Sequence, residues 1–289
     1  MRRALGTGIT AGVLIAIFAL IYVRGDREGN DRTQPLHALR PVALSCDAKE
    51  LVQASELEIE ADAIRLPTRL QARLGDGADA LHERWRAWLN DENLTRPRVR
   101  IRFVADPEEY AELYQGPIPA GADTSGFYRM RDNEAVVLYS AYRRQDTLAT
   151  TLHEMSHIFT AWHLGSMPIW FDEGLAEYFE TLNGRGEFPR SAEHIVVLRR
   201  DGALPLNTLT ELRRSEFGVR DARRHYASAW ALVAFLLEHE AGSKILRSGL
   251  RRAQNQACEA TRDSGLSLAA YPGGLSALEG DLNAWIQTL

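Results

Sequence analysis

The spacing of hydrophobic and polar residues divides this chain into three consecutive parts. Residues 4–23 are uncharged and mostly apolar, whereas residues 24–46 are mainly polar and contain few large apolar side chains. From residue 47 onwards, apolar positions recur with the periods of helices and strands. The pattern therefore predicts an apolar helix at 4–23, a linker or stalk at 24–46, and one long folded region after it.

The folded region shows helical periodicity first, then strand-like segments, then helices again. Residues 47–92 have a helical pattern that we expect to be interrupted near Pro67 and at the glycines of 75–77. The segments that follow are a strand at 99–104, a short helix at 107–114, and strands at 126–130 and 135–139 that flank a turn. After Asp146 the pattern is almost wholly helical. Strands that precede a long helical part are typical of an α+β fold.

Residues 4–23 have the length and composition of a membrane-spanning helix. Twenty helical residues extend about 30 Å, which matches the hydrocarbon thickness of a bilayer. Arg2 and Arg3 precede this segment and the charges just behind it balance, so the positive-inside rule places residues 1–3 in the cytoplasm. No small-x-small cleavage site follows the apolar run, which favours an uncleaved anchor over a signal peptide. We therefore expect a single-pass protein of the cell (inner) membrane whose folded part is extracytoplasmic or periplasmic.

Composition and charge narrow the class of protein. Of the 289 residues, 45% are hydrophobic and 25% are charged, which is typical of a globular protein and argues against a disordered chain. The net charge of −5 lacks the basic excess of a nucleic-acid-binding surface. The composition therefore predicts that nucleic acid is not a partner.

The chain has two cysteines, Cys46 and Cys258. Outside the cytoplasm they can form a disulfide, which would tie the start of the folded region to its last third. The alternative is two separate buried thiols. Since two cysteines allow a single intramolecular pairing, we favour the Cys46–Cys258 disulfide.

The residues that carry chemistry begin at His153. The segment His153-Glu154-Met155-Ser156-His157 matches the pattern H-E-x-x-H. On a helix, side chains four residues apart differ by about 40° in direction, so the two imidazoles can bind one zinc ion. Glu154 leaves the helix about 100° from the first histidine, where it can face a metal-bound water. The motif predicts a zinc site with a glutamate as general base.

An apolar stripe on the same predicted helix supports this interpretation. Its members recur at helical spacing: Leu148, Leu152, Met155, Phe159 and Trp162. The two histidines of the motif lie about 160° from the stripe on a helical wheel. We therefore expect one side of the helix to pack on the sheet and the opposite side to floor a cleft.

A zinc site needs a third protein ligand, and two residues compete for that role. His163 has the spacing of H-E-x-x-H-x-x-G-x-x-H, but Thr160 stands where that pattern requires a glycine. If the helix continues, His163 points away from His157. Glu173 opens a second helix after a turn at 165–168, and it is the preferred ligand. The alternative for Glu173 is a helix N-terminal acid that the dipole favours.

At this point the chain resembles a known family. HEMSH followed by PIWFDEGLAEYF is similar to the glutamate-zincins (gluzincins), the metallopeptidase group that includes thermolysin and aminopeptidase N. The resemblance is strongest to the peptidase MA-like families of largely uncharacterised bacterial proteins, and it covers roughly residues 97–240. It implies a zincin-type domain at 97–289, with a small sheet packed on the H-E-x-x-H helix and a mostly helical C-terminal part. Residues 47–96 would form a helical region before that domain.

The resemblance also implies roles for single residues. It makes His153, His157 and Glu173 the ligands of one Zn²⁺ per chain. Glu154 becomes the general base, and Glu177 resembles the carboxylate that holds a liganding imidazole through its other ring nitrogen. The interval from His157 to Glu173 is a few residues shorter than in thermolysin or aminopeptidase N, so the loop between the helices must be tight.

Substrate binding is a further expectation from the family. An extended peptide would lie along the edge of the strand before the active helix, and residues 135–139 fit that place. Tyr226 occupies a position where these families often carry a tyrosine that stabilises the oxyanion, and the adjacent His225 is the alternative. Tyr226 also fits a purely structural role, because it belongs to an apolar helix stripe.

The function that these residues favour is that of a membrane-anchored, extracytoplasmic, zinc-dependent peptidase. It would hydrolyse peptide or protein substrates with Glu154 as general base and a zinc-bound water. One alternative is a catalytically inactive zincin-fold binding protein of the bacterial envelope. Another is a membrane-tethered adaptor in which the motif is a coincidence. No ligand or base of the motif is missing, which favours the enzyme.

Overall fold

The computed structural model describes residues 57–289 except 62–63, 115–124, 131, 143, 184–185 and 259–265. The predicted anchor at 4–23, the linker at 24–46 and Cys46 lie outside the described residues. The anchor and the Cys46–Cys258 disulfide therefore stay predictions. Within the described ranges, no helix has the length and apolar character needed to cross a membrane.

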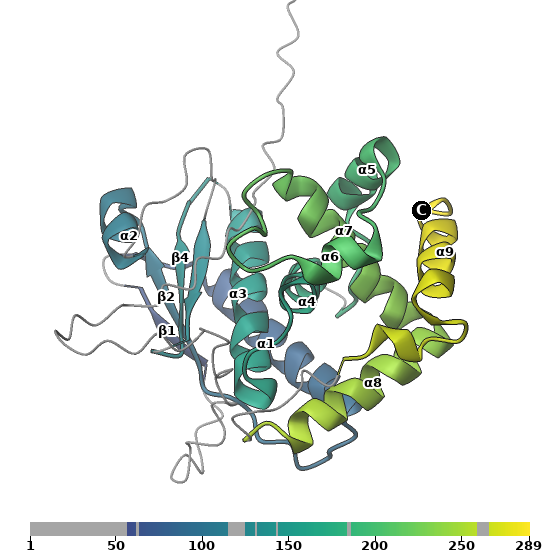
Figure 1. The fold of residues 1–289 in the computed structure, drawn as a ribbon. Coiled ribbons are helices and arrows are strands. Elements are labelled where there is room, and N and C mark those ends of the chain that lie inside the picture. Colours follow the sequence, from purple (N-terminus) through teal and green to yellow (C-terminus); the bar gives the residue numbers. More distant parts are fainter. Residues whose placement is uncertain are drawn as a thin grey trace, which may run out of the picture.

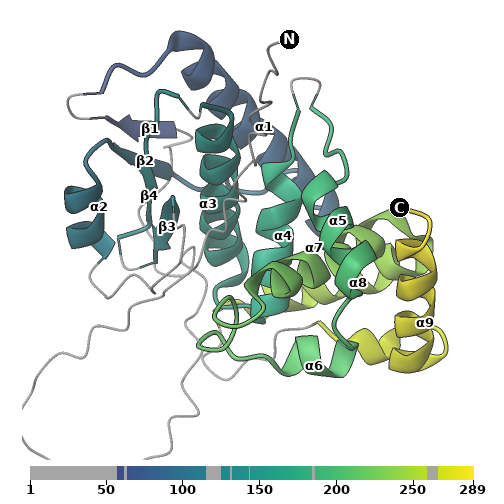
Figure 2. The same ribbon diagram turned by 90° about the horizontal axis from the view of Figure 1, so that it is seen from above.

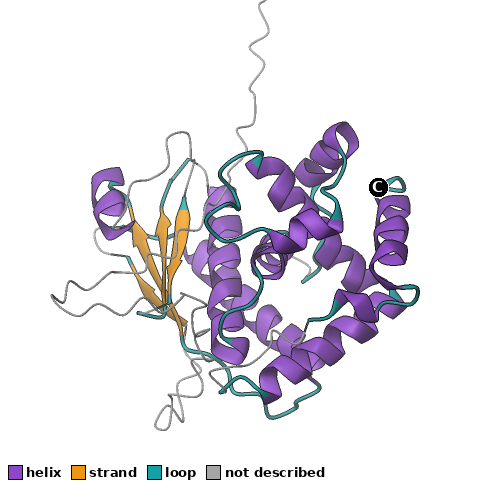
Figure 3. Ribbon diagram, viewed as in Figure 1, coloured by secondary structure: helices purple, strands orange, loops and turns teal. Residues whose placement is uncertain are grey.

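A four-stranded mixed sheet forms one layer of the fold (Figure 1). Its strands are β1 (Leu57–Glu60), β2 (Val99–Val104), β3 (Gly126–Arg129) and β4 (Glu134–Leu138). The strand order is β1-β2-β4-β3, in which β1, β2 and β4 run parallel and β3 is antiparallel to β4. The prediction of a strand at 99–104 and of two strands flanking a turn is confirmed. Mixed α+β architecture is also confirmed (Figure 3).

Helices make up the remainder of the fold. They are α1 (Thr68–Leu89), α2 (Pro107–Tyr114), α3 (Arg144–Leu164), α4 (Ile169–Glu180), α5 (Ala192–Asp201), α6 (Leu206–Glu211), α7 (Ala222–Glu238), α8 (Glu240–Asn255), the 3-10 helix Leu268–Ala270 and α9 (Gly274–Ile286). Viewed from above, α3 lies between the sheet on one side and α4 and α7 on the other (Figure 2). The H-E-x-x-H helix is therefore at the centre of the molecule.

Two expectations for residues 47–92 are wrong. Residues 57–60 form strand β1 rather than a helix, because the alternation Leu-Glu-Ile-Glu suits a half-buried strand. Strand β1 pairs with β2, so the sheet includes residues from both sides of the predicted domain boundary between 96 and 97. Helix α1 also runs through 75–77 without a break. A Cβ atom at Gly77 would lie 2.4 Å from Cδ2 of Leu152, so glycine lets α1 pack closely against α3.

The main core fills the space between the sheet and the helices. Val99, Ile101 and Phe103 of β2 contribute to it, together with Trp85 of α1 and most of α7. On the other face of the sheet, α2 covers a separate cluster of Val104, Tyr110, Tyr114, Phe127 and Val136. The sheet is therefore covered on its inner face by α3, against which α1 packs, and over part of its outer face by α2 (Figure 2).

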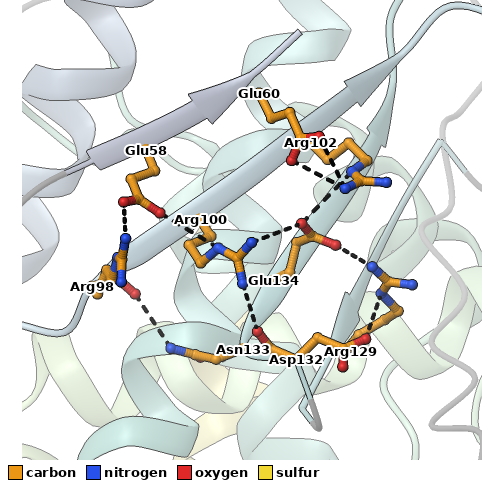
Figure 4. Close-up of polar contacts among 9 residues, drawn as sticks. All are labelled: Glu58, Glu60, Arg98, Arg100, Arg102, Arg129, Asp132, Asn133 and Glu134. Carbon is orange, nitrogen blue, oxygen red and sulfur yellow. Dashed lines mark hydrogen bonds and ion pairs between the residues drawn. The ribbon is translucent and has the colours of Figure 1, made fainter. Parts of the chain in front are cut away.

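Opposite charges alternate across the part of the outer face that α2 does not cover (Figure 4). We call these residues the sheet ladder: Glu58, Glu60, Arg100, Arg102, Arg129 and Glu134. Glu134 is only 2% exposed and lies 3.8 Å from Arg100, 3.7 Å from Arg102 and in contact with Arg129. Cross-strand pairs of opposite charge stabilise one register of neighbouring strands. The ladder thus fixes β4 and β3 relative to β2.

Candidate metal and catalytic site

A short connection between α3 and α4 brings the predicted ligands together. Helix α3 ends at Leu164 and α4 begins at Ile169, so the loop is tight, as expected from the short interval between His157 and Glu173. His153 and His157 lie on α3, and Glu173 lies on the first turns of α4. All three side chains are buried. The side of α3 that carries the histidines therefore packs against α4, and the expected cleft on this side stays a prediction.

The ligand atoms lie at separations suited to a metal ion. Nε2 of His153 is 3.5 Å from Oε2 of Glu173, and Nε2 of His157 is 3.9 Å from the same oxygen. One ligand atom from each residue lies within 4.8 Å of the other two. Bonds of 2.0–2.2 Å to a tetrahedral zinc separate ligand atoms by about 3.4 Å. This cluster, which we call the metal cluster, can hold a metal ion.

The environment of Glu173 supports this fit. Neither of its carboxylate oxygens has a hydrogen-bond partner among the described residues, although the side chain is completely buried. A buried carboxylate without hydrogen bonds is costly, and a bound cation removes that cost. The donor set of two imidazoles and one carboxylate is one that zinc accepts. The residues present therefore fit a metal ion.

The remaining ring nitrogens of both histidines face carboxylates. Nδ1 of His157 is 3.0 Å from Oδ1 of Asp172. Nδ1 of His153 is 3.7 Å from Oε1 of Glu177 and 3.5 Å from Oε2 of Glu180. A carboxylate at Nδ1 keeps a proton on that atom and leaves Nε2 free to bind a metal. Glu177 thus lies where a carboxylate partner of His153 is expected, with Glu180 beside it.

Further charged residues surround this arrangement. Arg214 donates to Oδ2 of Asp172 at 2.9 Å, and its other terminal nitrogen is 3.8 Å from Oε1 of Glu173. Burial opposes the charged form of Asp172, but His157 and Arg214 hold the pKa of its carboxyl well below the ordinary value. Asp172 therefore stays an anion that can orient the His157 ring.

His194 of α5 reaches the same group of residues. Its Nε2 is 2.6 Å from Oε2 of Glu177; the Glu177 side chain is buried, and that of His194 is 12% exposed. Burial acts against both charges, yet the pKa of His194 is raised by Glu177 and the pKa of Glu177 is lowered by His194. The two side chains form an ion pair behind His153.

Glu154 lies between α3 and strand β3. It is fully buried, and neither carboxylate oxygen has a hydrogen-bond partner among the described residues. A Cβ atom at Gly126 would lie 2.8 Å from Oε1 of Glu154, so the strand passes directly over the carboxyl group. Burial raises the pKa of Glu154 to about 8. A carboxyl group with such a pKa is suited to accept and return a proton near neutral pH.

The strand order corrects the expected substrate edge. Residues 134–138 form β4, which lies between β2 and β3 and has no open edge. Strand β3 is the edge strand nearest Glu154 among the described residues. The N–H of Leu138 donates to the carbonyl of Ser125, so the alternation of an antiparallel ladder turns the backbone groups of Gly126 and Tyr128 away from β4.

Tyr226 and His225 lie at the start of α7. Tyr226 is buried against Phe217, with ring centroids 5.0 Å apart, and is close enough to Arg214 to influence its pKa. Nδ1 of His225 accepts a hydrogen bond of 3.2 Å from the backbone N–H of Gly218. Arg214 thus lies close to both Tyr226 and Glu173, and the role of Tyr226 or His225 as oxyanion donor stays a prediction.

His163 is remote from the metal cluster. Helix α3 continues to Leu164, and the His163 ring packs against Trp85 of α1 at a centroid distance of 5.4 Å. The preference for Glu173 over His163 as the third residue of the cluster agrees with this placement.

Four residues of the site were not anticipated from the sequence: Asp172, Glu180, His194 and Arg214. The spacing of Glu173, Glu177 and Glu180 places all three on one helix face and is a signal for Glu180. Asp172 precedes the proposed ligand directly. His194 and Arg214 come from other elements, and no local pattern connects them to the motif.

Comparisons with known proteins add no support for the resemblance to the gluzincins. The chain matches no protein-family model and no curated protein sequence. The resemblance to the gluzincins therefore stays a prediction, carried by HEMSH and by the segment from Pro168 to Phe179.

Proposed function

We propose that this chain is a membrane-anchored, extracytoplasmic zinc peptidase of the gluzincin type with a zincin fold. One observation carries the proposal. The Nε2 atoms of His153 and His157 both face the Glu173 carboxylate, whose oxygens have no hydrogen-bond partner among the described residues, while each Nδ1 faces another carboxylate. A set of residues arranged to be completed by a cation is the expected form of a metal centre.

His153, His157 and Glu173 would hold the zinc ion. When bound, zinc polarises the scissile carbonyl and lowers the pKa of a water molecule. Asp172 holds a proton on Nδ1 of His157, and Glu177 and Glu180 do the same for His153. These carboxylates keep both rings in the tautomer that presents a lone pair at Nε2.

Glu154 performs the proton transfers in this proposal. Its carboxylate takes a proton from the attacking water as the new carbon–oxygen bond forms. The carbon–nitrogen bond then breaks, and Glu154 passes that proton to the leaving amine. Burial raises the pKa of Glu154 to about 8 in the metal-free chain, so its carboxylate form is a strong enough base to take a proton from a water that zinc would polarise.

Strand β3 would bind the substrate backbone. The outward-facing backbone groups of Gly126 and Tyr128 can pair with an extended peptide, which gives binding that depends little on side chains. The same strand touches Glu154 at Gly126, so a peptide bound there lies next to the proposed base. Tyr226 or His225 would donate to the oxyanion.

The activity is tested by digestion of a peptide library with the zinc-loaded chain, followed by mass spectrometry of the products. We expect cleavage by the parent and none by a Glu154→Gln variant that binds zinc equally well. Bound zinc with an intact library would contradict the peptidase and favour the envelope-binding protein. Absence of bound zinc would contradict the peptidase and favour a protein in which the motif has no catalytic role.

The membrane arrangement needs its own measurement. A reporter that works only outside the cytoplasm, fused after Leu289, should be active, and the chain should stay in membranes after carbonate washing. Recovery of a soluble form that starts near residue 25 would show that the apolar segment is cleaved. That outcome would leave the proposed chemistry unchanged.

A further inference from the structure

His194 is the single histidine of α5, and it is inserted between α4 and α7. Its Nε2 lies 2.6 Å from Oε2 of Glu177, and its ring packs against Trp230 of α7 at a centroid distance of 5.4 Å. The side chain of Ser191 caps α5 by accepting from the backbone N–H of His194 at 3.4 Å. Three contacts therefore fix the position of the ring: the Ser191 cap holds its backbone, Trp230 packs against the ring, and Glu177 binds its Nε2.

The two carboxylates that face Nδ1 of His153 differ in their surroundings. Glu180 lines a cavity of about 720 Å³ together with Arg69 and Arg73, and its side chain is 27% exposed. The side chain of Glu177 is 7% exposed and is held by His194 through one oxygen while the other faces His153. Glu177 thus has a hydrogen-bond partner on α5, while Glu180 lies slightly nearer to Nδ1 of His153.

We propose that His194 is a positioning residue for the metal site, an inference that rests on the proposed function. Its Nε2–H donates to Oε2 of Glu177, which leaves Oε1 facing Nδ1 of His153 at 3.7 Å, a separation that must shorten for a hydrogen bond to form when the metal is bound. The His153 ring is then held with its Nε2 toward Glu173. The order of contacts is His194, Glu177, His153 and Glu173, and it connects α5 to the metal cluster through α4.

The physical reason lies in how an imidazole binds a metal. A ring that is free to rotate loses conformational entropy on binding, and a carboxylate partner both fixes the ring and makes it a better electron donor. A carboxylate can do this only if its own orientation is defined. Glu177 leaves the last turns of α4 with several rotatable bonds, and His194 restricts them.

A purely structural role for His194 predicts different behaviour. In that case the ring would matter because it fills space against Trp230, and the hydrogen bond to Glu177 would be incidental. His194→Phe keeps an aromatic ring and removes the donor, whereas His194→Gln removes the ring and keeps a donor. The two roles therefore rank these variants in opposite orders.

The experiment measures the zinc dissociation constant of the full-length chain by competition with a chelator. We expect His194→Phe to weaken zinc binding by about tenfold, the lower end of the range for such partners, and His194→Gln by less than about threefold. His239→Phe is the matched control, because His239 stacks on Phe235 away from the site, and it should leave zinc binding unchanged.

A double-mutant cycle then tests whether His194 acts through Glu177. In a Glu177→Gln background, His194→Phe should produce no further loss of zinc affinity, because the contact it removes is already altered. Additive effects in the cycle would assign His194 to packing and overturn the inference. Equal zinc affinity of parent and His194→Phe would also overturn it, while leaving the proposed metal site intact.

A measurement on the parent chain covers the case in which a variant does not fold. Nitrogen-15 spectra of the zinc-loaded protein should show His153 with its proton on Nδ1, and a slowly exchanging proton on Nε2 of His194. A His194 ring proton that exchanges as fast as that of an exposed histidine would overturn the inference. If the parent binds no zinc, both this inference and the proposed function are wrong.

Discussion

The sheet ladder and the surroundings of the metal cluster differ in how much positive charge lies beside their buried carboxylates. In the ladder, Glu134 is almost fully buried and is surrounded by Arg100, Arg102 and Arg129. Around the metal cluster, Arg214 and the charged His194 accompany a larger set of carboxylates, which comprises Glu154, Asp172, Glu173, Glu177 and Glu180. The chain itself neutralises the first group, whereas the second is short of positive charge.

This difference separates a structural use of charge from a functional one. Buried acids that serve the fold are paired within the chain, because an unpaired one costs stability. A group of buried acids and imidazoles that lacks enough cations is stable only with an external cation or with protons. The raised pKa of Glu154 and Glu180, which burial causes in both, shows protons taking that role in the metal-free protein.

The largest expected effect follows from removing a residue of the metal cluster. His153→Ala, His157→Ala or Glu173→Ala should reduce bound zinc from about one per chain to none, because two protein ligands do not hold it. Elemental analysis of the purified chain measures this directly. His163→Ala is the control and should keep its zinc. If Glu173→Ala kept zinc and His163→Ala lost it, the choice of third ligand would be wrong.

The next effect concerns Glu154, which is part of the charge-poor site without being a ligand. Glu154→Gln should keep zinc and the fold but lower peptide turnover by at least ~10², because the general base is lost. Rates on a cleaved library peptide, measured beside zinc content, test this. A Glu154→Gln variant that hydrolysed the peptide at the parent rate would rule out the proposed mechanism.

Two isosteric variants, Glu154→Gln in the metal site and Glu134→Gln in the sheet ladder, test the difference between the two regions in the metal-free protein. Because burial raises the pKa of Glu154 to about 8, the stability that its bound proton provides is present below the ordinary pKa and is lost as pH rises through 8. Glu154→Gln removes this loss, so the metal-free variant should be more stable than the parent at pH 8 by on the order of 1–3 kcal/mol.

Glu134→Gln should change stability in the other direction. It leaves three arginines facing a neutral amide, so the free energy of unfolding should fall by about 1–3 kcal/mol. Urea unfolding of both variants at pH 8, with a chelator present, gives the two numbers. Changes of the same sign would show that the two regions do not differ as described.

The smallest effect is expected at the exposed end of the ladder. Glu58 contacts Arg98 and lies 3.5 Å from Arg100, but all three side chains are more than a third exposed. Glu58→Gln should therefore lower the free energy of unfolding by less than about 1 kcal/mol, and high salt should abolish the difference. A loss as large as that for Glu134→Gln would mean that burial does not govern the energetics of the ladder.

The sequence predicts best those elements and contacts that depend on residues close together in the chain. Alternation at 99–104 predicts β2, and one helical turn between His153 and His157 predicts that they share a side of α3. The placement of Glu173 and Glu177 near these rings follows from a tight loop and helical spacing. The sequence does not distinguish strand β1 from a helix, because four residues fit either pattern. It also does not show that β3 rather than β4 is the edge strand of the sheet, because strand order depends on how the chain crosses between strands. His194 escaped prediction because its contact with Glu177 spans elements that have no common periodicity.

The close approach of β3 to α3 restricts which substitutions the chain can accept together. A Cβ atom at position 126 would lie 2.5 Å from Cγ2 of Thr150 and 2.8 Å from Oε1 of Glu154. Thr150 can be exchanged for a smaller residue, so Gly126→Ala is sterically coupled to a change at 150. Glu154 cannot shrink without losing the proposed base. Position 126 is therefore constrained by packing against Thr150 and, under the proposed function, by the base at 154. When positions 126, 150 and 154 are randomised together, libraries selected for stability alone should accept larger residues at 126 that libraries selected for peptide cleavage reject.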